Sequence, residues 1–151
     1  MKNSTQKIDI IILEDNDFYR TALQKELKKT SQNFSPGDKF SFDFHVYSKA
    51  GDFLQDIRNE KFNDRNTIAF MDYYLGDGLN GGHILKILKG SNKRMKIILF
   101  SQSQNVIYSL RKKTDLNRDI DFIVKDQYTL AVCSLFLEQY IESKELLPVH
   151  I

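Results

Sequence analysis

The sequence is poor in features on which several classes of protein depend. It has one cysteine, Cys133, no tryptophan and only two prolines. A single cysteine excludes an intramolecular disulfide and a multi-cysteine zinc site, and it suits a reducing compartment such as the cytoplasm. No apolar run approaches the roughly 20 residues of a membrane-spanning helix. Asp9 interrupts the apolar stretch that follows Lys2 and Lys7, so a signal peptide is not predicted.

Charge and composition exclude further classes. The 22 Lys and Arg against 20 Asp and Glu leave a net charge of +2, which is too balanced for a protein built around a nucleic-acid footprint. The phosphate-binding patterns GxxxxGK[ST] and GxGxxG do not occur. Hydrophobic residues make up 41% of the chain and charged residues 28%, as in globular proteins. We expect residues 1–151 to form a single domain with a core of about 7–144.

Short apolar runs predict the strands of a buried sheet. They are IDIIIL at 8–13, TIAFMD at 67–72, MKIILF at 95–100 and IDFIV at 120–124. Residues 40–47, FSFDFHVY, instead alternate between aromatic or aliphatic and polar side chains, which predicts a half-exposed strand at a sheet edge. The preceding residues 30–39, which include Pro36 and Gly37, are predicted to form an inserted loop.

Apolar residues at helical spacing predict helices between these strands. The first expected helix starts at a cap at Asn16 or Asp17 and ends near Lys29, and the second follows a cap at Ser48. The third spans 82–90, with Gly90 as a stop, and the fourth follows a cap at Ser103. The fifth runs from about Gln127 to Ser143. Strands that alternate with helices predict an α/β fold, a doubly wound five-stranded parallel sheet with helices on both faces. Such sheets bind ligands at the carboxyl ends of their strands.

Chemically complementary residues follow the predicted strands. Glu14 and Asp15 follow the first strand, Asp72 ends the third, Ser101 follows the fourth and Lys125 follows the fifth. Crowded carboxylates repel one another, and a hard cation such as Mg²⁺ usually resolves that repulsion. The ammonium and the hydroxyl suit an anion. Together these groups predict a site for phosphoryl chemistry, with a carboxylate as the attacking group.

On these residues the chain resembles the receiver domains of two-component response regulators, which have the CheY-like, flavodoxin-like fold. The resemblance covers about residues 7–144 and implies the strand order 2-1-3-4-5, which places 40–47 at an edge. It implies that Asp72 takes a phosphoryl group from a histidine kinase or a phosphotransfer protein in the cytoplasm. The protein would then be a signalling phosphoacceptor and not an enzyme, with at most self-phosphorylation and slow self-dephosphorylation.

The resemblance also implies a role for each residue of the site. Asp15, Asp72 and the backbone carbonyl of Tyr74 would bind Mg²⁺ directly, Glu14 would bind it through water, Lys125 and the amides of Tyr73 and Gln102 would hold the phosphoryl oxygens, and Ser101 and Phe122 would switch. Asp126 stands where the family usually has a proline, so we expect a different turn there. The bulky Tyr74 and Gln102 are expected to slow loss of the phosphoryl group.

The last predicted helix motivates a prediction about output. One stripe, Leu130, Cys133, Leu137 and Ile141, has the spacing of a face packed on the sheet. A second apolar set comprises Tyr128, Val132, Leu135 and Phe136. Unless this helix is simply buried more broadly, that set predicts an exposed patch on the face of the fourth helix, fifth strand and fifth helix.

That patch would bind a downstream protein or a second copy of the chain, with no direct nucleic-acid or membrane contact. The chain ends soon after this helix without a helix-turn-helix pattern, which favours a stand-alone receiver. Two alternatives stay open. The chain could be the N-terminal regulatory part of a DNA-binding response regulator, or a scaffold receiver that is never phosphorylated.

Overall fold

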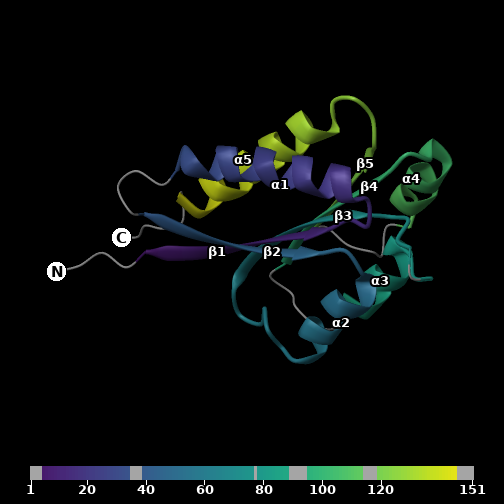
Figure 1. The fold of residues 1–151 in the computed structure, drawn as a ribbon, viewed down its shortest axis with the longest axis horizontal. Helices are drawn as coiled ribbons and strands as arrows, with labels where there is room; N and C mark the ends of the chain where they lie inside the picture. The colour runs from purple at the N-terminus through teal and green to yellow at the C-terminus, as the bar shows by residue number, and fades with distance from the viewer. Residues whose placement is uncertain (1–4, 35–38, 77, 89–94, 114–118, 146–151) are drawn as a thin grey trace.

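The computed structural model describes residues 5–34, 39–76, 78–88, 95–113 and 119–145, in which strands and helices alternate along the chain (Figure 1). The strands are β1 (Gln6–Leu13), β2 (Phe40–Tyr47), β3 (Asn66–Asp72), β4 (Met95–Ser101) and β5 (Ile120–Val124). The helices are α1 (Asp17–Gln32), α2 (Ala50–Arg58), α3 (Gly81–Leu88), α4 (Gln104–Arg111) and α5 (Thr129–Glu145). In this described part, no helix combines the length and the apolar character that crossing a membrane requires.

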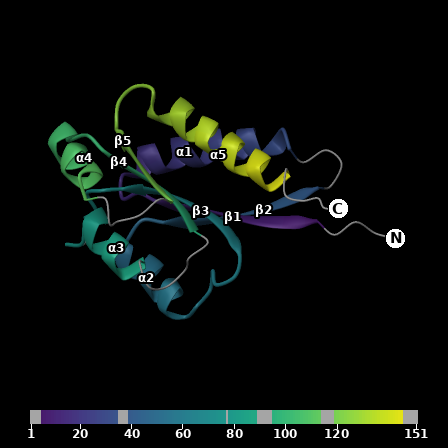
Figure 2. The same cartoon turned by 180° about the vertical axis from the view of Figure 1, so that it is seen from behind.

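The strands form one parallel sheet in the order β2-β1-β3-β4-β5, which confirms the predicted fold class. Helices α1 and α5 lie side by side on one face, and α2 and α3 cover the other (Figures 1 and 2). In β1, Ile8, Ile10 and Ile12 pack toward α1 and α5, whereas Ile11 and Leu13 pack toward α2 and α3. All five are fully buried, so this interior strand lacks the polar alternation of a half-exposed one.

The alternating strand lies at the sheet edge, as its pattern predicts. β2 pairs with β1 along one side, from Gln6 opposite Phe40 to Leu13 opposite Tyr47. Phe40 is buried, and Phe42 and Phe44 pack partly buried against the core beneath α1 and α5. The polar positions between them remain partly exposed. The period-two pattern therefore identified both the strand and its position.

Helix α1 is longer than its apolar spacing indicates. It ends at Gln32, not near Lys29, so the predicted start of the loop at residue 30 is wrong. Thr30 and Ser31 are buried, and the Thr30 hydroxyl hydrogen-bonds the Ser134 hydroxyl on α5. Packing against α5 thus prolongs a helix whose last turn is polar. Residues 35–38 of the predicted insertion lie outside the described residues.

The predicted helix caps agree with the structure at two of three positions. Asn16 Oδ1 accepts a hydrogen bond from the Tyr19 amide (2.8 Å), and Ser103 Oγ accepts one from the Val106 amide (3.2 Å). The predicted cap at Ser48 is wrong, because the N-cap residue of α2 is Lys49, which makes no capping hydrogen bond with its side chain. The apolar positions of α2 hold that helix on the sheet without a capping hydrogen bond. Gly90, the predicted stop of α3, lies outside the described residues.

Candidate functional site

Three carboxylates meet where β1 and β3 end. Glu14 and Asp15 directly follow β1, and Asp72 is the last residue of β3, its neighbour in the sheet. One oxygen from each of the three lies within 4.8 Å of the others. Glu14 is fully buried and Asp72 is 8% exposed, whereas Asp15 is open to solvent. This set of hard oxygen donors, partly open to water, fits a divalent cation such as Mg²⁺.

Lys125 brings a positive charge to two of these carboxylates. Its Nζ donates to Glu14 Oε1 at 2.9 Å and to Asp72 Oδ2 at 3.4 Å. The Lys125 amide donates to the Ser101 carbonyl (2.7 Å), which fixes the end of β5 against the end of β4. The lysine side chain is 11% exposed. Its ammonium is therefore largely desolvated and in contact with the carboxylates of both Glu14 and Asp72.

Glu14 is the fixed carboxylate of the pair. Its Oε1 accepts from Lys125, and its Oε2 accepts from the Asn16 amide at 3.0 Å. Arg20 on α1 donates to the Glu14 backbone carbonyl at 2.9 Å, which fastens the residue to the first turn of that helix. With both carboxylate oxygens engaged, Glu14 suits a place at the edge of a cation site rather than direct coordination.

The surroundings of Asp72 raise its pKa to about 6. Burial is the largest cause, the negative charge of Glu14 is the second, and the ammonium of Lys125 acts in the opposite direction. At neutral pH the carboxylate is ionised, yet it is more basic than an ordinary aspartate. An ionised and basic oxygen at the mouth of a pocket is suited to attack an electrophilic phosphorus atom.

Ser101 and Phe122 lie beside this centre but are engaged elsewhere. Ser101 is fully buried, and its Oγ accepts from the Ser103 amide at 3.1 Å, inside the turn between β4 and α4. Phe122 on β5 is partly buried and packs against the core beneath α2 and α3. Arg111 of α4 donates to its backbone carbonyl. That Ser101 and Phe122 change position on phosphorylation stays a prediction.

The loop after Asp72 forms one wall of a pocket over the carboxylates. Tyr74, 56% exposed, and Gln102 both line this pocket. A Cβ atom on Gly76 would lie 3.0 Å from Asp15 Oδ2, which shows how closely the loop passes that carboxylate. The Tyr73 amide donates to the Phe100 carbonyl (2.8 Å). That amide already has a hydrogen-bond partner in this structure, whereas its expected role is to bind a phosphoryl oxygen.

Asp126 builds the turn into α5 by side-chain hydrogen bonds. Its Oδ1 accepts from the Tyr128 amide at 2.8 Å, and its own amide donates to Thr129 Oγ1 at 2.7 Å. A proline at this position could not donate the second of these bonds. The turn is thus built differently, as the departure from the family pattern indicates, and α5 begins at Thr129 rather than at Gln127.

The sequence interpretation missed part of the pocket. Phe18 and Tyr19, at the start of α1, line it together with Asn16 and Asp126. Tyr19 lies directly beneath the ammonium of Lys125, with 4.0 Å between Nζ and the ring centre. The neighbouring Phe18 is 83% exposed. The rotation of α1 about its axis decides which of the two rings lies against Lys125.

The two faces predicted for α5 are only partly separate. Cys133, Leu137 and Ile141 are fully buried as predicted. Of the second apolar set, Tyr128 and Leu135 are 62% and 55% exposed, whereas Val132 is partly buried. Phe136 packs partly buried against the core beneath α1 and α5. The exposed patch is therefore smaller than the sequence indicates, because Phe136 contributes to the core.

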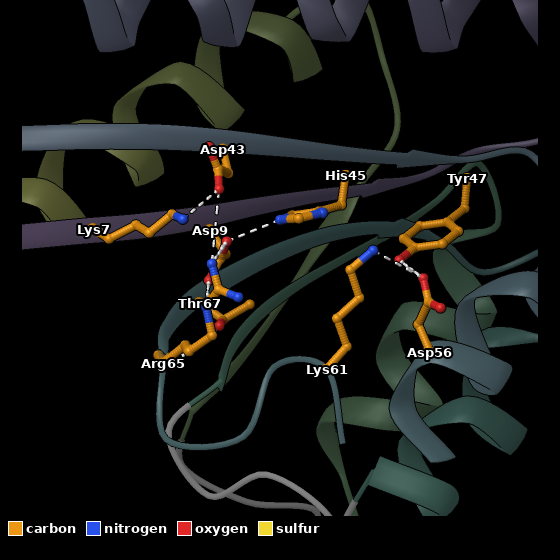
Figure 3. Close-up of polar contacts among 9 residues, drawn as sticks. All are labelled: Lys7, Asp9, Asp43, His45, Tyr47, Asp56, Lys61, Arg65 and Thr67. Carbon is orange, nitrogen blue, oxygen red and sulfur yellow. Dashed lines mark hydrogen bonds and ion pairs between the residues drawn. The ribbon is translucent and has the colours of Figure 1, made fainter. Parts of the chain in front are cut away.

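A second polar cluster lies on the α2 and α3 face, away from the strand ends (Figure 3). Its centre is Asp9, a fully buried residue of β1. Arg65 Nε lies 2.6 Å from Asp9 Oδ2, and His45 Nε2 lies 2.8 Å from Asp9 Oδ1. Asp43 pairs with Lys7 at 2.8 Å. Because Arg65 forms an ion pair with the buried carboxylate and His45 forms a hydrogen bond with it, this cluster joins β1, β2 and the segment before β3 and has a structural role.

Comparison with known proteins places the fold among receiver domains. No protein-family model matches the chain, and no curated protein is significantly similar to it in sequence. A receiver domain from Rhodospirillum rubrum matches with a TM-score of 0.69 at 15% identity, over 87% of this chain and 94% of that one. The isolated RcsB receiver domain of Salmonella enterica serovar Typhimurium, solved with the phosphomimetic BeF₃⁻, matches with a TM-score of 0.61 at 18% identity, over 89% and 90%.

A structure of the response regulator RcsB in complex with DNA matches as well, with a TM-score of 0.62 at 14% identity. The match covers 93% of this chain but only 64% of that one. At these identities the likeness concerns the course of the backbone. The chain thus has the fold of response regulator receiver domains, which confirms the fold that the resemblance implies.

Proposed function

We propose that this protein is a phosphoacceptor receiver of a two-component or phosphorelay system. Asp72 takes the phosphoryl group from a phosphohistidine on a histidine kinase or a phosphotransfer protein. The observation that carries the proposal is the contact of Lys125 with both Glu14 and Asp72, at the carboxyl ends of a sheet with the receiver order. Three carboxylates and one ammonium in this fold support phosphoryl transfer better than any other reaction.

In the transfer step, an Asp72 oxygen forms a bond to phosphorus while the bond from phosphorus to the histidine nitrogen breaks. The nitrogen keeps the electron pair of that bond and the imidazole leaves, so an acyl phosphate remains on Asp72. Lys125, now 3.4 Å from Asp72 Oδ2, would follow the transferred charge to a phosphoryl oxygen. The Gln102 amide would hold a second one. Groups already aimed at the developing charge lower the barrier without reorganising.

The carboxylates fit Mg²⁺ as the cofactor. Asp15, Asp72 and the Tyr74 backbone carbonyl would hold the ion, and Glu14 would reach it through water because both of its carboxylate oxygens have hydrogen-bond partners. Once bound, the ion supplies positive charge for the phosphoryl oxygens. Asp15 is the most exposed of the three carboxylates, so it is the first contact that a hydrated ion would meet.

Output follows from the same atoms. The phosphoryl group adds nearly two negative charges. Ser101 Oγ, which now accepts from the Ser103 amide, would turn to donate to a phosphoryl oxygen, and Phe122 would move into the vacated space. These changes would alter the face formed by α4, β5 and α5, where Tyr128 and Leu135 are exposed. A downstream protein or a second copy would bind there.

The role of a regulatory part in a DNA-binding response regulator is kept as a second candidate. It is favoured by the matched structure of RcsB with DNA, of which this chain covers only part. In that case the output face would contact a DNA-binding domain rather than a separate protein. The chemistry at Asp72 would be the same in both cases.

The proposal is tested by incubating the protein with a small phosphodonor and Mg²⁺ and measuring its intact mass. We expect the mass of one phosphoryl group on the wild type and on Asp52→Asn, an exposed carboxylate of α2, and none on Asp72→Asn. Uptake by Asp72→Asn would contradict the assignment of the nucleophile. A wild type that takes up no phosphoryl group from any donor would favour the scaffold role.

A further inference from the structure

The ammonium of Lys125 lies close to two aromatic rings as well as to two carboxylates. Its Nζ lies 4.0 Å from the centre of the Tyr19 ring and 5.5 Å from the centre of the Phe100 ring. The same atom lies 2.9 Å from Glu14 Oε1 and 3.4 Å from Asp72 Oδ2. Both ring distances are within the roughly 6 Å over which a cation is attracted to the face of an aromatic ring.

Contacts other than the one with Lys125 hold the Tyr19 ring in place. Tyr19 lies in the first turn of α1, where its amide donates to the capping side chain of Asn16. Its ring packs partly buried in the core beneath α1 and α5, tilted 54° to the Phe100 ring with 6.1 Å between their centres. The neighbouring Phe18, by contrast, is 83% exposed. Tyr19 therefore offers a rigid surface, whereas the four-carbon stem of a lysine is flexible.

The ring acts as a neutral aromatic face and not as a charged group. Burial raises the pKa of Tyr19 well above its usual value, so the hydroxyl keeps its proton at neutral pH. The attraction of Lys125 to Tyr19 thus comes from the ring face, which phenylalanine also has and leucine lacks. This difference separates the electrostatic effect of the ring from the volume that it fills.

We propose that Tyr19 is a positioning residue for Lys125, holding its ammonium against Glu14 and Asp72. The ring limits the ammonium to the side of the carboxylates and excludes water from its other side. During phosphoryl transfer the ammonium would then shift from an Asp72 oxygen to a phosphoryl oxygen while it stays on the ring. The contact itself is independent of the proposed function, but its effect on phosphoryl transfer rests on that function.

The contact is tested by NMR of the Lys125 ε-methylene group, whose signal is assigned by its loss in Lys125→Gln. A ring face this close shifts the signal upfield. We expect the shift to persist in Tyr19→Phe and to disappear in Tyr19→Leu. Tyr108→Leu is the matched control and should leave the Lys125 signal unchanged. It removes an exposed ring of α4 whose centre lies 4.3 Å from the Nζ atom of another lysine, Lys112. An unchanged Lys125 shift in Tyr19→Leu would overturn the inference.

Positioning is tested by two rates in the same variants. Tyr19→Leu should accelerate the acylation of Lys125 by an amine-reactive acylating reagent, measured by mass spectrometry. It should also slow the phosphorylation of Asp72 about fivefold, as expected for the loss of one cation–aromatic contact. Tyr19→Phe should restore both rates. If Tyr19→Leu fails to fold, Tyr19→Met gives the same comparison.

The two rates also separate this inference from the proposed function. If the wild type takes up no phosphoryl group, the proposed function fails, and the acylation rate alone decides whether Tyr19 holds Lys125. Faster acylation in Tyr19→Leu would then support the inference. If both rates equal those of the wild type while the NMR shift is lost, Tyr19 touches Lys125 without positioning it, and the inference is overturned.

Discussion

At the scale of single residues, the charge on Asp72 is the feature with the largest consequences. Asp72 is almost fully buried beside the carboxylate of Glu14, and Lys125 offsets that repulsion only in part. Its pKa of about 6, against an ordinary value of 3.8, means that the folded protein binds this proton more tightly than the unfolded chain does. The same environment that makes the oxygen a better nucleophile therefore costs stability.

We expect Asp72→Asn to stabilise the metal-free protein at pH 7 by about 3 kcal/mol, because asparagine carries no charge into the buried site. The wild type carries the full cost of the charge above pH 6 and none below pH 3.8, so the gain should fade as pH falls between these values. Urea unfolding in the presence of a chelator at pH 7 and near pH 4 measures it. A variant less stable than the wild type at pH 7 would mean that the attraction to Lys125 outweighs burial and Glu14.

We expect two other side chains to control the lifetime of a phosphorylated form. Hydrolysis needs a water in line with the bond from phosphorus to the Asp72 oxygen, and Tyr74 and Gln102 line the pocket through which that water would come. We expect Tyr74→Ala and Gln102→Ala each to accelerate decay of the phosphorylated protein several-fold, followed by intact mass over time. Tyr108→Ala, on the outside of α4, is the control. Unchanged decay in both variants would exclude shielding.

At the scale of secondary structure, the turn before α5 joins the site to the output face. Lys125 contacts the carboxylates, Asp126 forms the turn, and Thr129 begins the helix. The Asp126 side chain and amide make two short hydrogen bonds that order this segment. This hydrogen-bonded segment connects Lys125 directly to the first turn of α5.

We expect Asp126→Ala to lower the free energy of unfolding by about 1 kcal/mol, the usual effect of losing a side-chain bond at the start of a helix. Gln127→Ala, at an exposed position of the same turn, is the matched control and should change stability much less. Urea or thermal unfolding of both variants measures the difference. Equal stability of the two variants would show that the turn does not need the Asp126 carboxylate.

At the scale of the whole molecule, the exposed part of α5 bears on assembly. Tyr128 and Leu135 are the exposed members of its second apolar set. An exposed apolar patch on such a face commonly binds a partner. Because Phe136 belongs partly to the core, Leu135 is the better position at which to test the patch.

We expect sedimentation velocity with Mg²⁺ and BeF₃⁻ to show self-association of the wild type, and Leu135→Asp to reduce it. Leu135 is 55% exposed, so a charge there can be solvated without disturbing the core. Gln139→Glu, at an exposed position of the same helix, adds the same single negative charge without removing an apolar side chain and is the matched control. A wild type that remains monomeric with and without the mimic would exclude a second copy as the partner and leave a different protein.

The sequence by itself determined the elements, their order and the residues at the strand ends. The side chains that a strand or helix buries are apolar, so they recur along the sequence with the period of that element. This repeat predicted the buried strands, the alternating edge strand and the helices. The carboxyl ends of parallel strands share one edge of the sheet, so Glu14, Asp15, Asp72, Ser101 and Lys125 could be brought together before their coordinates were known.

The tertiary structure alone decided which side chains from different elements touch. Periodicity tells which face of a helix is buried but not which atom of another element it meets. That Tyr19 lies under Lys125, that Arg65 neutralises Asp9, and that Thr30 prolongs α1 by bonding to α5 depend on helix rotation and on contacts between distant residues. The raised pKa of Asp72 has the same origin, because burial and the nearness of Glu14 exist only once the sheet has formed.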